Sequence, residues 1–75
     1  MKWYWFSFSY KAENQGCCNV EANNPKEALQ KTIDLNIHPK HDDIEVYELD
    51  EPQLEPNKLI LREELSKSGF KNVRS

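Results

Sequence analysis

Aromatic residues occupy every even position from 4 to 10 and two of the odd positions near the start of the chain. The even positions from 4 to 10 hold Tyr, Phe, Phe and Tyr, and the odd positions from 3 to 9 hold two tryptophans and two serines. Because successive side chains of a strand point to opposite faces of a sheet, this period predicts a strand over residues 2–12. We expect the face with the tyrosines and phenylalanines to pack under a helix. The face with Trp3, Trp5 and Ser7 would then meet solvent, a partner chain or a ligand.

A second strand is predicted to form a hairpin with the first. Turn residues at 13–16, where Gly16 can take a positive φ, separate the first strand from a second strand over residues 17–23. The apolar face of this second strand consists of Cys18, Val20 and Ala22. Its polar face includes Asn19, which would share the outer side of the sheet with the tryptophans.

The clearest boundary in the chain lies between Asn24 and Glu27. Asn24 suits the N-cap of a helix, Pro25 suits the first helical position, and Glu27 can complete a capping box. Apolar residues then recur at helical spacing, which predicts a helix over residues 25–35. Asn36 is expected to end this helix in a left-handed conformation.

The rest of the chain predicts a third strand and a second helix. The third strand is expected over residues 44–49, and an extended connector with two prolines follows at 51–59. A short helix over 61–68 comes next, with a glycine at its C′ position and a phenylalanine packing back on it. Residues 71–75 are expected to be a flexible tail.

Together these elements predict a single α+β domain over residues 1–70 with the element order ββαβα. A helix that links the second strand to the third favours placing the third strand beside the first. We therefore expect an antiparallel sheet of spatial order 2-1-3, with the first helix on one face. The predicted core consists of Tyr4, Phe6, Phe8, Val20, Leu29, Ile33 and Val46.

The composition places this domain near the lower limit of size. A chain of 75 residues gives a single core of marginal stability, so we expect a homodimer or higher homo-oligomer. No apolar stretch is long enough for a membrane span, and the N-terminus lacks the features of a signal peptide. We expect a cytoplasmic protein, in the host-cell cytoplasm if it is phage-encoded. Its adjacent cysteines, Cys17 and Cys18, would be reduced there.

The formal net charge is −3, and its distribution along the chain is uneven. Residues 42–56 contain seven acids and no Lys or Arg, whereas residues 57–75 contain five bases and two acids. This acidic stretch argues against general nucleic-acid binding, which needs a basic surface. It is either a solvated face of the domain or an imitation of DNA phosphates that would block a nucleic-acid enzyme.

The outer face of the predicted sheet carries the candidate binding residues. Aromatic rings beside hydroxyl and amide groups can hold a planar ligand through stacking and a few polar contacts, while lysines balance its charge. The candidate ligand- or partner-binding residues are Trp3, Trp5, Ser7, Lys11, Asn19, Lys40 and Tyr47. In the alternative interpretation, the second helix or a second copy of the chain covers the tryptophans.

Two histidines and the aspartates beside them are candidates for a metal site or a catalytic site. His38, His41, Asp42 and Asp43 include the H-x-x-H spacing found in some zinc and nickel sites, but nothing in the sequence fixes them as ligands. Apart from the two cysteines, neither histidine has a nucleophile to activate. We therefore expect no metal, no cofactor and no enzymatic activity.

Four segments of the chain carry a resemblance to a known group of proteins. They are Tyr4-Trp-Phe-Ser-Phe8, Val20-Glu-Ala22 leading into Glu27-Ala-Leu29, Leu35-Asn-Ile-His-Pro39, and Arg62-Glu-Glu-Leu65. Together they resemble short, largely uncharacterised proteins of bacteriophages and bacteria with the pattern VEA…EA…LGINP…REEL. Asn36 replaces the usual glycine of that pattern, and His38 replaces its asparagine. The resemblance implies a viral, anti-defence setting.

Three functions stay open on the sequence. The first is a non-enzymatic inhibitor of host antiviral defence that sequesters a nucleotide-like signal, such as a cyclic dinucleotide or an ADP-ribose derivative. The second is a protein–protein inhibitor of a bacterial defence protein or nucleic-acid enzyme, acting through the acidic and aromatic surface. The third is a small structural domain whose aromatic face builds a homodimer.

Overall fold

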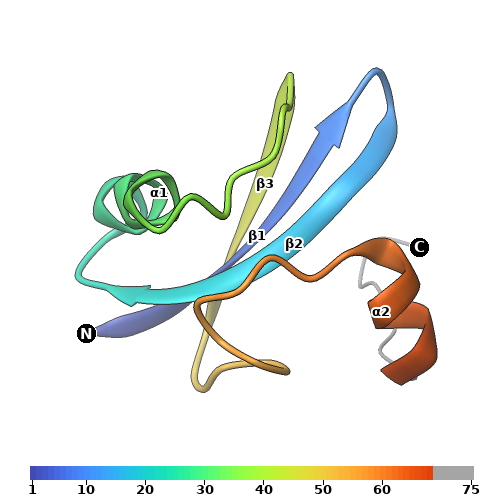
Figure 1. The fold of residues 1–75 in the computed structure, drawn as a ribbon. Coiled ribbons are helices and arrows are strands. Elements are labelled where there is room, and N and C mark those ends of the chain that lie inside the picture. Colours follow the sequence, from blue (N-terminus) through green and yellow to red (C-terminus); the bar gives the residue numbers. More distant parts are fainter. Residues whose placement is uncertain (69–75) are drawn as a thin grey trace.

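The computed structural model describes residues 1–68 and has the predicted α+β architecture (Figure 1). Its elements are β1 (Lys2–Tyr10), β2 (Glu13–Ala22), α1 (Pro25–Asp34), β3 (Asp43–Leu49) and α2 (Arg62–Ser68). The strands form one antiparallel sheet of order β2-β1-β3, so the predicted fold class and strand order are confirmed. The predicted domain end at residue 70, the glycine and phenylalanine after α2 and the tail at 71–75 lie outside the described residues.

The β1–β2 hairpin turns at Lys11 and Ala12, not at the predicted residues 13–16. Both residues have positive φ, 50° and 66°, as the central residues of a type I′ turn do. This turn continues the twist of the two strands. Neither residue is a type that favours positive φ, so the local sequence carried no sign of the turn. Both strand boundaries move accordingly, and β2 begins four residues earlier than predicted.

Gly16 lies at a β-bulge in β2. The register shifts there, because Phe8 pairs with Gly16 whereas Ser9 pairs with Asn14. The predicted positive φ of Gly16 is confirmed at 126°. A Cβ atom at this position would lie 2.8 Å from Cδ1 of Leu59. The positive φ favours glycine at the bulge, and the close Leu59 side chain and Ile60 carbonyl oxygen leave little room for a Cβ atom.

Helix α1 begins and ends as predicted, within one residue. The Asn24 side chain accepts a hydrogen bond from the Glu27 backbone N–H (2.9 Å) and donates one to the Glu27 carboxylate (3.0 Å). The helix is capped at its other end by Leu35, and Asn36 follows with a φ of 57°. The left-handed conformation predicted for Asn36 is confirmed.

The core on the α1 face of the sheet contains most, but not all, of the predicted residues. It consists of Tyr4, Phe6, Phe8, Cys18, Val20, Ala22 and Ala28. Leu29 is half-buried and packs against this cluster. Ile33 and Val46, also predicted as core, are 45% and 42% exposed. Ile33 is exposed because α1 buries Ala28 and Thr32 instead. Val46 is exposed because α1 packs mainly over β2, at the other edge of the sheet from β3.

A second core lies on the opposite face of the sheet, where residues 50–61 and α2 cover it. We call residues 50–61 the strap; Figure 1 shows it passing beside β2 on its way to α2. Trp5, Cys17, Ile60 and Leu65 form this second cluster. The strap is bound to β2 through the Cys17 and Ile60 backbones, which exchange two hydrogen bonds of 2.8 and 2.7 Å. The predicted alternative, in which the second helix covers the tryptophans, holds for Trp5 only: Leu65 of α2 and Ile60 of the strap pack with it, whereas Trp3 is half-buried.

Candidate functional site

The predicted outer-face residues are mostly covered by the strap. Trp5 and Ser7 are each 6% exposed and Asn19 is fully buried, whereas Trp3 and Tyr47 are half-buried. The expectation that this face is open to a ligand is therefore wrong for Trp5, Ser7 and Asn19. A planar ligand could reach them only after the strap had moved away.

Asn19 holds the strap in place. Its side-chain Oδ1 accepts a hydrogen bond of 2.7 Å from the Gln53 backbone N–H. Its backbone oxygen accepts a second hydrogen bond, of 2.9 Å, from the Asn57 N–H. The amide that was predicted to contact a ligand is thus used inside the domain to position its own C-terminal segment.

The two candidate lysines lie at the other end of β1. The Nζ atoms of Lys11 and Lys40 are 5.4 and 4.6 Å from the centroid of the Tyr10 ring, close enough for cation–π attraction. Tyr10 is seven residues along the strand from Trp3, which is roughly 23 Å at about 3.3 Å per residue. The seven candidate residues therefore do not form one site, because the lysines are too far from the tryptophans to balance the charge of a stacked ligand.

Both cysteines are buried and free, on opposite faces of the sheet. Burial raises the pKa of the Cys17 thiol above its ordinary value of 9.0, although hydrogen bonds with Ser7 and Asn14 oppose this. Burial also raises the pKa of Cys18, to about 12. A thiol that is buried and protonated at neutral pH is a poor nucleophile, so neither cysteine is activated for catalysis.

We expect both thiols to resist alkylation in the folded protein. Iodoacetamide at pH 8 should label them much more slowly than in urea, as followed by mass spectrometry. Because the pKa values are raised by folding, the unfolded state loses its thiol protons first when the pH rises above about 9. The free energy of unfolding should therefore fall between pH 9 and 12. Rapid labelling of Cys18 under native conditions would contradict this burial.

The segment with His38 and His41, between α1 and β3, packs against one end of the α1-face core. The His41 ring lies 5.1 Å from the Phe8 ring, and its Nδ1 is 2.7 Å from the Pro39 carbonyl oxygen. His38 meets His41 edge-on at 6.5 Å between ring centroids. Within residues 1–68, no three His, Cys, Asp or Glu side chains are grouped so that they could hold a metal ion. Over the same residues no helix is long and apolar enough to cross a membrane.

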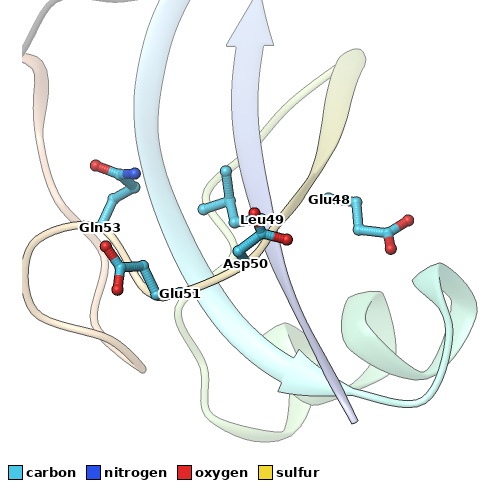
Figure 2. A pocket seen from close by; sticks show the side chains of 5 residues that line it. All are labelled: Glu48, Leu49, Asp50, Glu51 and Gln53. Carbon is cyan, nitrogen blue, oxygen red and sulfur yellow. The ribbon is translucent and has the colours of Figure 1, made fainter.

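An acidic hollow lies on the described surface, at the end of β3. It has a volume of about 540 Å³ and is lined by Glu48, Leu49, Asp50, Glu51 and Gln53. Figure 2 shows these side chains at the end of β3 and the start of the strap. The Lys2 ammonium lies 2.7 Å from Glu48, and this exposed contact raises the pKa of Lys2. Lys2 offsets the charge of Glu48, and the carboxylates of Asp50 and Glu51 still oppose a phosphate-bearing ligand at this hollow.

The outer edge of β2 is largely occupied by the chain itself. The strap pairs with Cys17 and Asn19, as described above. Beyond them, the backbone oxygen of Glu21 accepts a hydrogen bond of 2.8 Å from Lys31 Nζ. Of the two edges of the sheet, this one is therefore closed by the strap and α1.

The alternation of backbone groups shows which atoms lie on the other edge, along β3. Cys17 directs its N–H and C=O groups to Ile60, away from β1, so its neighbour Cys18 directs them toward Phe6. The next positions of β1, Trp5 and Ser7, then point toward β3. Their partners on β3 are Tyr47 and Glu45. The residues whose N–H and C=O groups point outward from β3 are Ile44, Val46 and Glu48.

This open edge is the feature that reasoning from the sequence missed. Among the backbone hydrogen bonds formed outside the sheet by residues 1–68, none involves Ile44, Val46 or Glu48. The signal was present in the predicted strand order, because order 2-1-3 already makes the third strand an edge. Unpaired edge groups can accept a strand from another chain.

Comparisons of the chain with protein-family models, curated protein sequences and solved structures found no match.

Proposed function

We propose that this chain is a non-enzymatic protein-binding inhibitor that recognises a basic segment of its partner through β3 and the acids around it. The observation that carries the proposal is the open edge of β3 inside an acidic stretch. Residues 42–56 contain seven acids and no base. A bacterial defence protein or a nucleic-acid enzyme is the proposed target, because the segments quoted above resemble phage proteins and basic surfaces are typical of nucleic-acid enzymes.

Protein binding fits the geometry better than sequestration of a nucleotide. A nucleotide needs stacking surface and positive charge in one place. Here Trp5 is buried and the lysines lie at the opposite end of β1. The hollow at the end of β3 is lined by carboxylates, which repel phosphate.

The proposal is tested by capture of a protein from bacterial lysate, identification by mass spectrometry and reconstitution with the purified partner. Replacement of Asp42, Asp43, Glu45 and Glu48 by Asn or Gln should weaken the complex and its salt dependence, because it removes four negative charges on and beside β3. As a matched control, Glu13, Glu21 and Glu27, which lie away from β3, are changed to Gln. Calorimetry with cyclic dinucleotides and ADP-ribose should show no binding.

Equal capture by both variants would show that the acids are only solvated. Micromolar binding of a cyclic dinucleotide would instead return the function to sequestration of a signal.

A further inference from the structure

We infer that the partner supplies an extended segment that adds to β3 as a fourth strand, with basic and apolar residues in alternation. This inference rests on the proposed function and names the chemistry of the partner. It combines three properties of β3: the direction of its backbone groups, the apolar surface on one side and the charge on the other.

The backbone of β3 is arranged to accept a strand. The outward groups belong to alternate residues, Ile44, Val46 and Glu48, which is the spacing of hydrogen bonds in an antiparallel ladder. Val46 lies at the centre of the strand, where β1 pairs it with Phe6. Strand addition of this kind obtains affinity from the main chain and specificity from alternate side chains.

The α1 side of β3 leaves apolar surface open. Val46 is 42% exposed, and its neighbour on this face, Ile44, is half-buried. Ile33 and Leu35, from α1 and its C-cap, are also exposed on this side of the sheet. Alternate residues of an added strand would project over Val46, so burial of apolar side chains there is favourable.

The opposite side of β3 is acidic. Asp43 and Glu45 project there, and the Glu45 carboxylate accepts a hydrogen bond of 2.8 Å from the Tyr47 hydroxyl. Asp50 and Glu51 continue the acidic track beyond the strand. Opposite charges on directly paired strand residues are stabilising, so the residues of the partner on this side should be Lys or Arg.

Charge also distinguishes this occupant from a second copy of the chain. An antiparallel pair of β3 strands would gather the carboxylates of Asp43, Glu45 and Glu48 from two chains that each carry a net charge of −3. Acidic side chains on an edge strand are a common protection against such self-pairing. A basic segment removes the repulsion and uses the same backbone groups.

The test is a titration of the ¹⁵N-labelled protein with a peptide of alternating lysine and valine, followed by NMR. The amide resonances of Ile44, Val46 and Glu48 should shift most, and their hydrogen exchange should slow. A control peptide of the same composition, with all lysines grouped before all valines, should bind more weakly. A peptide of alternating glutamate and valine should not bind. Equal binding of the first two peptides, or shifts confined to other elements, would overturn the inference.

A variant pair tests the backbone separately from the side chain. Val46→Pro removes an outward N–H and leaves the ladder to β1 intact, so it should lower the affinity for the alternating peptide about tenfold. Val46→Thr keeps the N–H and the β-branched shape, so its affinity for the alternating peptide should fall less. If Val46→Pro does not fold, hydrogen exchange of the free wild type tests which backbone amides point outward from β3. The amides of Ile44 and Val46 should exchange faster than that of Tyr47, and the reverse order would contradict the assigned edge.

Failure of this inference can be told apart from failure of the proposed function. Strand addition would be overturned if a purified partner needed the acids for binding but the peptides did not bind at β3. The inhibitor function would then still be supported. Peptide binding at β3 with no acid-dependent protein partner would support the edge geometry and overturn the inhibitor function. Concentration-dependent broadening of the β3 resonances without peptide would show that a second copy occupies the edge.

Discussion

Phe6→Ala is expected to unfold the protein. Phe6 is 1% exposed and lies in the middle of the central strand, paired with Cys18 on one side and Val46 on the other. Truncation of a buried Phe costs about 3–5 kcal/mol. A domain of this size has about 5 kcal/mol or less of stability. Far-UV circular dichroism at 25 °C should therefore show a largely unfolded variant.

The matched control is Asn24→Ala, which removes the N-cap of α1 and no core contact. The lost bond to the Glu27 N–H should cost about 1 kcal/mol, so the variant should stay folded with a lower melting temperature. If Phe6→Ala and Asn24→Ala melted at the same temperature, the α1-face cluster would not be the principal core.

The parts of the fold that could be predicted are those specified by short stretches of sequence. The period of two in β1 assigned Tyr4, Phe6 and Phe8 to one face, and the Asn24–Glu27 pattern located the start of α1. The hairpin turn could not be predicted, because Lys11 and Ala12 take positive φ without a local preference for it. There the pairing of the two strands overrides the preference of the turn residues.

The candidate site was harder to predict, because it depends on which segment covers which face. Alternation placed Trp5 and Asn19 on the outer face correctly, but it carried no information about the strap. The strap has no hydrophobic period, and its bond from Gln53 to Asn19 joins residues 34 positions apart in the chain. Contacts this distant in sequence leave no pattern in a single segment, so the sequence left open whether the outer face binds a ligand or is covered.

The exposure of Ile33 and Val46 could not be predicted from periodicity either. Both have the spacing of core residues, since Ile33 follows the helical period and Val46 shares the inner face of its strand with Ile44. Periodicity gives the direction of a side chain but not the width of the layer that covers it. One helix of ten residues does not cover all three strands, and the uncovered position is on β3. This shortfall in coverage is what leaves the apolar side chain of Val46 exposed on β3.

Trp5→Ala distinguishes a core role of the outer face from a ligand-binding role. Trp5 is 6% exposed and packs in one cluster with Cys17, Ile60 and Leu65. Loss of the ring should cost about 3–5 kcal/mol, as for other buried aromatic residues, and should loosen the strap. Urea denaturation should show a large loss of stability, and the Ile60 amide, which bonds to the Cys17 carbonyl, should exchange faster in any folded fraction.

Trp3→Ala is the control on the same face of β1, where loss of a half-buried ring should cost less stability. If Trp5→Ala kept the stability of the wild type, the strap would not be packed stably against this face of the sheet. The outer face with Trp3 and Trp5 could then be a binding surface.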